Sequence, residues 1–171
     1  AIGEGNISRG DKILVALCDP IDGVFSLDTN MLNANRFATL ANETGIELEV
    51  LTKAMELARH IGSRGREGHS VGAMFAIGSI PKLRKYSTSL VLNPFKGHDA
   101  SKKTIINNEN HETFAEFAWL DGAMFFNKEG IASDAGRYIQ VPAGIQPKYG
   151  EGGRHLAARA ISQLAECIAI C

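Results

Sequence analysis

The sequence has little of what marks secreted, zinc-binding or membrane-spanning proteins. Its 171 residues include three cysteines, Cys18, Cys167 and Cys171, and none stands in a C-x-x-C pair, which argues against a zinc site. Cys18 and Cys167 lie in apolar runs, so we expect buried thiols in a reducing compartment. No apolar run approaches the roughly 20 residues of a membrane span, and no charged segment followed by an apolar stretch opens the chain. We expect a soluble, cytoplasmic protein with no membrane partner.

An excess of charge of either sign is also missing. Eighteen Lys and Arg face nineteen Asp and Glu, a formal net charge of −1, so nothing in the total draws the protein to nucleic acid and we expect no such partner. The histidines show no H-x-x-x-H or similar spacing, which argues against a histidine metal cage. The G-x-x-x-x-G-K-[ST] motif is absent, as are G-x-S-x-G and a G-x-G-x-x-G after a strand, so the P-loop, hydrolase-elbow and dinucleotide-binding classes are excluded.

What the chain does have is a series of short apolar runs between helical patterns. A capping box formed by Thr44 and Glu47 predicts the start of a helix that ends before Gly62, and Asn127–Gly130 predicts a tight turn between paired strands. Such an order predicts an α/β fold, a single domain with a central mixed β-sheet flanked by helices. Strands are predicted at 12–18, 71–78, 90–92, 124–126, 131–139 and 167–171, and helices at 44–61, 81–87, 111–120 and 154–166.

The stretch Gly152-Gly153-Arg154-His155 stands at the predicted start of the last helix. The first amides of a helix lack intrahelical partners, and the helix dipole places partial positive charge there. Glycine lets an anion approach the backbone, and arginine offers a planar fork of donors suited to phosphate. His155 and Arg159 share a helical face because they are four residues apart. Two interpretations stay open here, a phosphate cradle and a solvated helix start.

The stretch Asp121-Gly122-Ala123 lies between a predicted helix and a predicted strand. An aspartate there could point at a ligand, hold a divalent metal or attract a hydroxyl proton. Gly122 and Ala123 would let that ligand lie close to the backbone. An ordinary turn is the alternative, and these three residues alone do not exclude it.

Taken together, three stretches resemble the diadenylate cyclase catalytic domain, most closely its archaeal type. They are G-R-E-G-H-S-V-G-A-M-F-A-I-G, then L-D-G-A-M-F-F-N-K-E-G-I-A-S-D-A-G-R-Y-I, and then G-G-R-H-L-A-A-R-A-I-S. The family's D-G-A motif matches residues 121–123, and its R-H-R motif, which follows a threonine, matches Arg154 and His155. The chain departs from the family where Leu156 replaces the second arginine and Gly153 the threonine. Many members also continue past the last strand with a segment containing serine and glutamate, whereas this sequence stops at Cys171.

The resemblance implies the condensation of two ATP molecules into cyclic di-AMP and two pyrophosphates, with Mn or Mg as the divalent metal. It implies a homo-oligomer in which two domains face each other, each holding one ATP. Asp121 and His155 are then the expected catalytic and metal-binding residues, and Arg159 could substitute for the missing arginine. The expected substrate-binding residues are Gly122, Ala123, Gly153, Arg154, Arg137 and Arg159.

We expect residues 46–171 to form the cyclase-like domain and residues 1–45 to form an N-terminal segment and connector. Residues 9–23 look similar to the end of a pyruvate-kinase C-terminal-like domain, so the segment could be the tail of such a domain. Residues 24–43 show a weak pattern rich in Asn and Thr and are expected to be a connector. An alternative function is a sensor that binds adenine nucleotides without catalysis.

Overall fold

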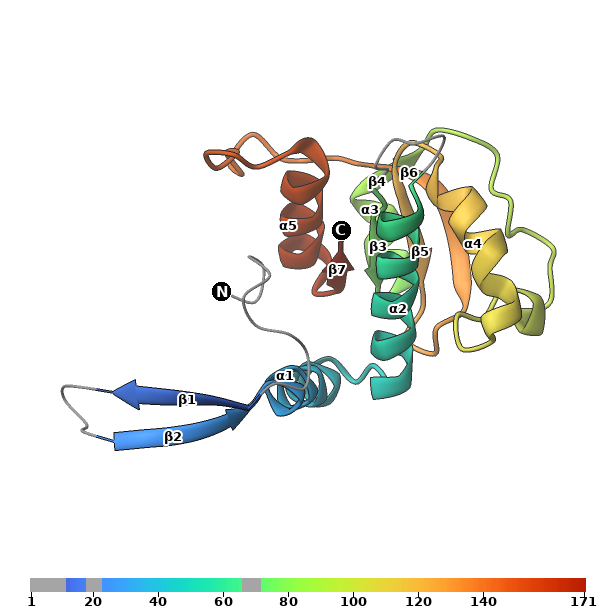
Figure 1. Ribbon diagram of the computed structural model, residues 1–171. Coiled ribbons are helices and arrows are strands. Elements are labelled where there is room, and N and C mark those ends of the chain that lie inside the picture. Colours follow the sequence, from blue (N-terminus) through green and yellow to red (C-terminus); the bar gives the residue numbers. More distant parts are fainter. Residues whose placement is uncertain (1–11, 18–22, 66–71) are drawn as a thin grey trace. The chain divides into compact units, whose positions relative to one another are not determined.

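The computed structural model describes residues 12–17, 23–65 and 72–171, with side chains from residue 37 onward (Figure 1). The chain divides by its internal contacts into two compact units, 1–43 and 44–171. In the first unit, β1 (Lys12–Leu17) pairs antiparallel with β2 (Gly23–Asp28). The helix α1 (Thr29–Thr44) follows directly. The stretch expected to be a connector thus contains a helix that its weak pattern did not predict: Asn and Thr are only moderate helix formers, but the Ala, Leu and Met between them support a helix of 16 residues.

The second unit contains a five-stranded sheet in the order β4-β6-β5-β3-β7 (Figure 1). Strands β3 and β5 are parallel, and the other neighbouring pairs are antiparallel. The predicted α/β fold with a central mixed sheet is confirmed. The strands are β3 (Phe75–Ile77), β4 (Ser87–Ser89), β5 (Ala123–Phe126), β6 (Ala132–Ile139) and β7 (Ile168–Ile170), and the helices are α2 (Leu48–Arg64), α3 (Ile80–Lys85), α4 (His111–Ala118) and α5 (Gly153–Ala165).

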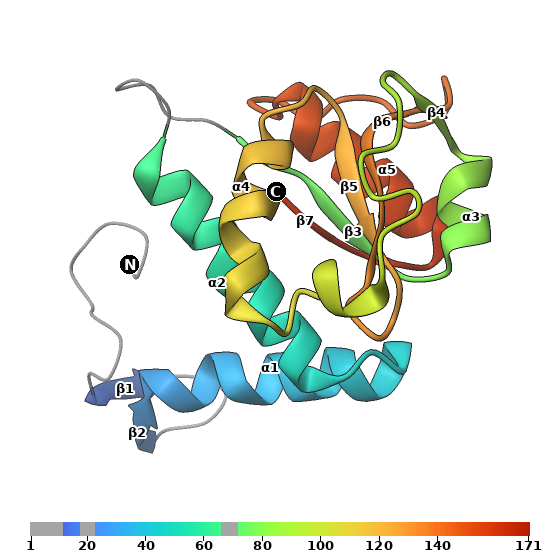
Figure 2. The same ribbon diagram turned by 90° about the vertical axis from the view of Figure 1, so that its right-hand side faces the viewer.

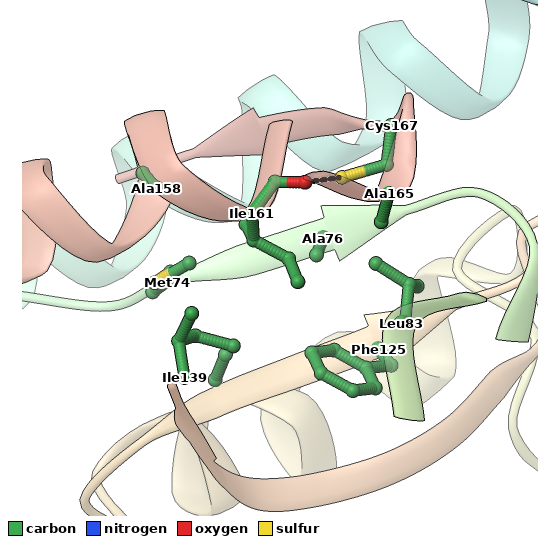
Figure 3. Packing of buried hydrophobic residues seen from close by; sticks show 10 residues of the cluster. Met74, Ala76, Leu83, Phe125, Ile139, Ala158, Ile161, Ala165 and Cys167 are labelled. Atoms are coloured by element: carbon green, nitrogen blue, oxygen red, sulfur yellow. Dashed lines mark hydrogen bonds between the residues drawn. The ribbon is translucent and has the colours of Figure 1, made fainter. Parts of the chain in front are cut away.

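Helices cover both faces of this sheet, with α5 on one side and α2 and α4 on the other (Figures 1 and 2). Because side chains alternate along a strand, Phe125 points toward α5 while Phe126 points toward α4. Figure 3 shows the α5 side, where Ile161 points from the helix toward the sheet that carries Ala76 and Phe125, and the Cys167 thiol donates to the Ile161 carbonyl at 3.5 Å. On the α4 side Phe126 packs edge-on against Phe75 and Phe114.

The start, end and buried face of α2 differ from expectation. Thr44 ends α1 and forms no capping box, and Glu47 precedes α2 without a side-chain cap. The helix passes Gly62 and ends at Gly65, whose φ of 59° lies in the left-handed region that glycine tolerates. The sequence pattern predicts a buried face of Leu48, Leu51, Met55 and Ala58 flanked by Ala54 and Ile61, whereas the buried residues are Val50, Leu51, Ala54, Leu57 and Ile61.

Several other boundaries shift by a few residues. Within the described residues of the predicted strand 71–78, only Phe75–Ile77 is strand, and β4 lies at Ser87–Ser89 instead of 90–92. The last strand is half-buried, not buried, and Cys171 is exposed. The β5–β6 hairpin is confirmed, with Gly130 at a φ of 77°. Among the described residues, no helix is both long and apolar enough to cross a membrane.

Candidate active site

One cavity of about 490 Å³ opens between the start of β5, the end of β6 and the first turn of α5. Six of the eight residues singled out from the sequence line it: Asp121, Gly122, Ala123, Arg137, Gly153 and Arg154. The structure thus brings together stretches that are separated by about thirty residues. The remaining lining residues, mostly apolar, are Met74, Tyr138, Ile139, Val141, Leu156 and Ala157.

The strand side of the cavity is held by close backbone packing at Gly122. This residue has a φ of 98°, and a Cβ atom placed there would lie 2.7 Å from the Arg137 carbonyl oxygen. Only glycine combines that conformation with that approach. The Gly122 amide donates to Oδ1 of Asp121 at 3.0 Å, which orients the exposed carboxylate at the cavity edge. Asp121 is therefore presented to the cavity by a turn that the glycine makes possible.

Arg137 lies on β6 and pairs with Ala123 on β5. Its Nε and one terminal nitrogen donate to the Ser87 hydroxyl, and the same terminal nitrogen donates to the Ser87 carbonyl at 2.9 Å. The guanidinium also lies 5.8 Å from the centre of the Phe125 ring. Arg137 therefore contributes a fixed positive charge, with part of its donor capacity already used inside the protein.

The helix side of the cavity is the uncapped beginning of α5. Gly152 is the N-cap and offers no side-chain cap, and the first turn contains no acidic residue. Its leading amides are open to an anion. The Arg154 side chain is exposed and lies across Gly72, where a Cβ would come within 3.2 Å of a terminal nitrogen. In the described part of the chain, Arg154 has no carboxylate partner, so its charge is available to a ligand.

His155 and Arg159 do not line this cavity. His155 lines a second, more open hollow of about 320 Å³, together with residues 148–151. Arg159 forms an ion pair with Glu151, with Nη to Oε2 at 2.8 Å. Hydrogen bonds from Arg159 and from the Lys148 amide lower the pKa of Glu151 to about 2, so this carboxylate stays charged at neutral pH. The start of α5 thus separates two hollows, and the histidine faces the smaller one.

A preformed metal cage is absent from the described residues, where no group of three His, Cys, Asp or Glu side chains converges. In the part of the chain that the structure describes, Asp121 is the single carboxylate that lines the larger cavity. Mg²⁺, and by similar oxygen-ligand preference Mn²⁺, is commonly held by one or two carboxylates together with substrate phosphates and water. One exposed aspartate beside an anion-binding helix start fits a metal that arrives with a phosphate-bearing substrate.

Two curated archaeal proteins are similar to this chain. A diadenylate cyclase of Methanocaldococcus jannaschii is 38% identical over 120 residues, which are 70% of this chain and 38% of that protein. A diadenylate cyclase of Haloferax volcanii is 34% identical over 123 residues, 71% of this chain and 44% of that protein. The two relatives support a domain of the diadenylate cyclase family in this chain. It spans less than half the length of either relative.

No family model and no solved structure matches the chain. Its apolar cavity residues escaped sequence reasoning because an apolar side chain in a strand or helix is usually core. Leu156 was noticed only as a departure from the R-H-R motif, yet it lines the cavity. Residues 65–69 open the first of the three stretches that resemble the family, and from Arg66 to residue 71 that stretch lies outside the described residues.

Proposed function

We propose that this domain is a diadenylate cyclase that condenses two ATP molecules into cyclic di-AMP and two pyrophosphates. One observation carries the proposal: the Asp121 carboxylate and the cationic start of α5 border the same cavity. Two curated relatives bear the name diadenylate cyclase, which supports the same reaction. The cavity combines apolar walls suited to a purine ring with two arginines suited to phosphate.

In the proposed reaction, the 3′-oxygen of each ATP forms a bond to the α-phosphorus of the other. At each α-phosphorus the bond to the oxygen that bridges to the β-phosphate breaks, so that two pyrophosphates leave, each with the electron pair. Asp121 orients the attacking hydroxyl and accepts its proton. Gly153, Arg154 and the open amides of α5 hold the triphosphate, and Arg137 adds positive charge at the floor. Gly122 and Ala123 let the nucleotide lie against the start of β5.

A divalent ion, Mn or Mg, would be held by Asp121 together with the phosphates, and His155 is a second candidate ligand from the neighbouring hollow. When bound, the ion supplies charge neutralisation at the α-phosphate. The chain's own residues position both reactants, which is the main contribution that a protein makes to transfer at phosphorus.

Each cavity holds one ATP in this proposal, so two domains must face each other in a homo-oligomer. Exposed apolar side chains beside the cavity support such a contact. Tyr138 lines the cavity and is 57% exposed, and Val91 is 40% exposed. Val91 lies next to Gly136, which in turn adjoins the Asp121 carbonyl. A second copy would cover these side chains, which are otherwise costly to leave in water.

The test is incubation of the protein with ATP and Mn²⁺ or Mg²⁺, followed by chromatography for cyclic di-AMP and pyrophosphate. We expect both products in a ratio of one to two, and no product with ATP when a chelator removes the ion. Sedimentation of the same samples should find a dimer or larger assembly when nucleotide is present. Absence of the cyclic product under every ion and protein concentration would reject the cyclase.

A second candidate is a sensor that binds adenine nucleotides without catalysis, which Leu156 favours because it occupies the cavity where the family motif has an arginine. The sensor predicts that ATP or cyclic di-AMP raises the melting temperature while no product forms. The cyclase predicts stabilisation by ATP together with turnover. A chain that no adenine nucleotide stabilises would fit neither function.

A further inference from the structure

A compact polar cluster ties the second turn of α5 to the loop before the helix. Arg159 holds Glu151 with two bonds, from Nε to Oε1 at 2.9 Å and from one terminal nitrogen to Oε2 at 2.8 Å. That terminal nitrogen also donates to the Gln146 carbonyl at 2.8 Å. Oε2 of Glu151 accepts the Lys148 backbone N–H at 2.8 Å. We call this cluster, formed by Glu151, Arg159 and the backbone of residues 146 and 148, the Glu151–Arg159 clamp.

Both side chains of the clamp are less exposed to solvent than those of the Lys82–Glu166 pair at the other end of the helix. The clamp's side chains are 25% exposed at Arg159 and 11% at Glu151, whereas the Lys82–Glu166 pair is 53% and 76% exposed. A bidentate pair with restricted access to water is stronger and more directional than an exposed one. The clamp can therefore fix the local backbone in a way that a typical surface pair does not.

The backbone that it fixes leads straight into the cavity. Glu151 immediately precedes the N-cap Gly152, and the next two residues, Gly153 and Arg154, line the cavity. No side-chain cap holds this end of α5. The link from the second turn of the helix back to the residue before its N-cap thus sets the direction in which the leading amides and Arg154 point.

Arg159 is poorly placed to contact a ligand in the larger cavity. It does not line that cavity, and its Nε and one terminal nitrogen are committed to Glu151 and Gln146. The helical position that does face the cavity one turn earlier is Leu156. An arginine that left its half-buried carboxylate to bind phosphate would leave Glu151 without its partner, which is costly.

We propose that Glu151 and Arg159 are positioning residues that act through the backbone to aim Gly153 and Arg154 at the triphosphate. The proposal rests on the nucleotide function proposed above, and it assigns to Arg159 a role other than direct substitution for the missing arginine. Loss of either Glu151 or Arg159 removes bonds that hold the same loop, residues 146–151. The two substitutions are therefore expected to weaken nucleotide binding equally and without adding to each other.

The experiment compares Glu151→Gln, Arg159→Gln and the double variant with Glu166→Gln, a matched control. Glu166 also pairs with a cation, Lys82, but at the far end of α5. Each clamp variant should raise KM for ATP by about tenfold with kcat changed less than about twofold, and the double variant should resemble the singles. Arg159→Lys should recover part of the loss because it keeps the charge but not the fork. The control should match wild type.

Amide hydrogen exchange gives a readout that does not need turnover. Both clamp variants should speed exchange at residues 146–156 while β3 and β5 stay protected. Additive KM effects, or a rise in KM for Arg159→Gln alone, would overturn the proposal in favour of direct contact with nucleotide. Faster exchange with unchanged KM would overturn it in favour of a purely structural pair. Wild-type protein that neither binds nor converts ATP would reject the nucleotide function itself, and with it the aiming role, whatever the exchange data say of the loop.

Discussion

The two sides of the cavity are held in different ways. On the strand side, Gly122 packs its backbone against that of Arg137, and the Arg137 side chain is bonded to Ser87. On the helix side, Arg154 is exposed and rests on Gly72, and the loop before it is tied by side chains. One side is thus fixed by main-chain contact inside a sheet, and the other by side-chain contacts at the surface.

In the proposed reaction, this difference suits the strand side to proton transfer and the helix side to binding of the triphosphate. A group that takes a proton must be held within a fraction of an ångström, which backbone packing provides. Groups that neutralise a triphosphate tolerate more movement, since charge acts over a longer range than a proton transfer does. We therefore expect changes on the strand side to reduce kcat and changes on the helix side to raise KM.

The largest effect is expected for Asp121→Asn. The amide keeps the size of the side chain but cannot accept a proton, so the rate of cyclic di-AMP formation should fall by about 10²–10⁴-fold. ATP binding, measured by thermal shift or calorimetry without turnover, should change little. Asp99→Asn, in an exposed loop, serves as the control for loss of one carboxylate. A variant at position 121 that retains the full rate would remove this residue from the chemistry.

Substitution of Gly122 should show how rigid the strand side is. In Gly122→Ala the new Cβ would meet the Arg137 backbone at 2.7–2.8 Å, and the φ of 98° is strained for any other residue. Unfolding should become easier by about 1–3 kcal/mol, and kcat should fall with it. Gly144→Ala is the matched control, because nothing lies within 4 Å of its Cβ position. Equal melting temperatures for the two variants would contradict the packing argument.

Arg154→Ala should weaken ATP binding more than it slows the chemistry. Loss of the Arg154 guanidinium, which pairs with no carboxylate among the described residues, is expected to raise KM by about 10- to 100-fold, equivalent to about 1.4–2.7 kcal/mol. Arg59→Ala, an exposed arginine on α2, provides the control. Steady-state kinetics with ATP give both constants. An unchanged KM would remove Arg154 from the phosphate site and break the distinction between the two sides.

Half of the residues that line this cavity could be predicted from the sequence. The D-G-A and G-G-R-H stretches each carry residue types with a local physical meaning, and the order of strands and helices predicted the mixed sheet that joins them. The hairpin was predictable because Gly130 and Asn127 mark a turn whatever the rest of the fold does.

What sequence reasoning missed depends on contacts between distant residues. Glu151 and Arg159 are eight residues apart across a helix start, a spacing with no local signature. Gly72 matters because of Arg154, a residue 82 positions away. The α1 helix escaped because its Asn and Thr residues suggest loops when counted by type. The partners of Arg159 and Arg154 are therefore set by the fold, whereas α1 was missed because of its local composition.

Gly72→Ala tests the helix side without replacing any residue that is proposed to bind nucleotide. An added methyl would lie 3.2–3.4 Å from the Arg154 side chain, so the guanidinium must shift by a few tenths of an ångström. We expect KM for ATP to rise about two- to fivefold, less than for Arg154→Ala, with kcat preserved. Gly62→Ala is the control, since its Cβ position is open and alanine favours the helix. A KM equal to wild type would mean that the arginine moves freely at this contact.

The smallest effect is expected from acid. The pKa of Glu151 is lowered from 4.5 to about 2, chiefly by its hydrogen bond with Arg159 and next by the Lys148 amide. A lowered pKa stabilises the folded state above pH 4.5, and this contribution is lost as the pH falls toward 2. Melting temperatures of wild type and Glu151→Gln should differ most above pH 5 and converge in acid. Glu166→Gln should show a smaller difference, because its pair with Lys82 is far more exposed. A gap between wild type and Glu151→Gln that stays constant from pH 6 to pH 3 would show that charge on this carboxylate does not hold the helix side in place.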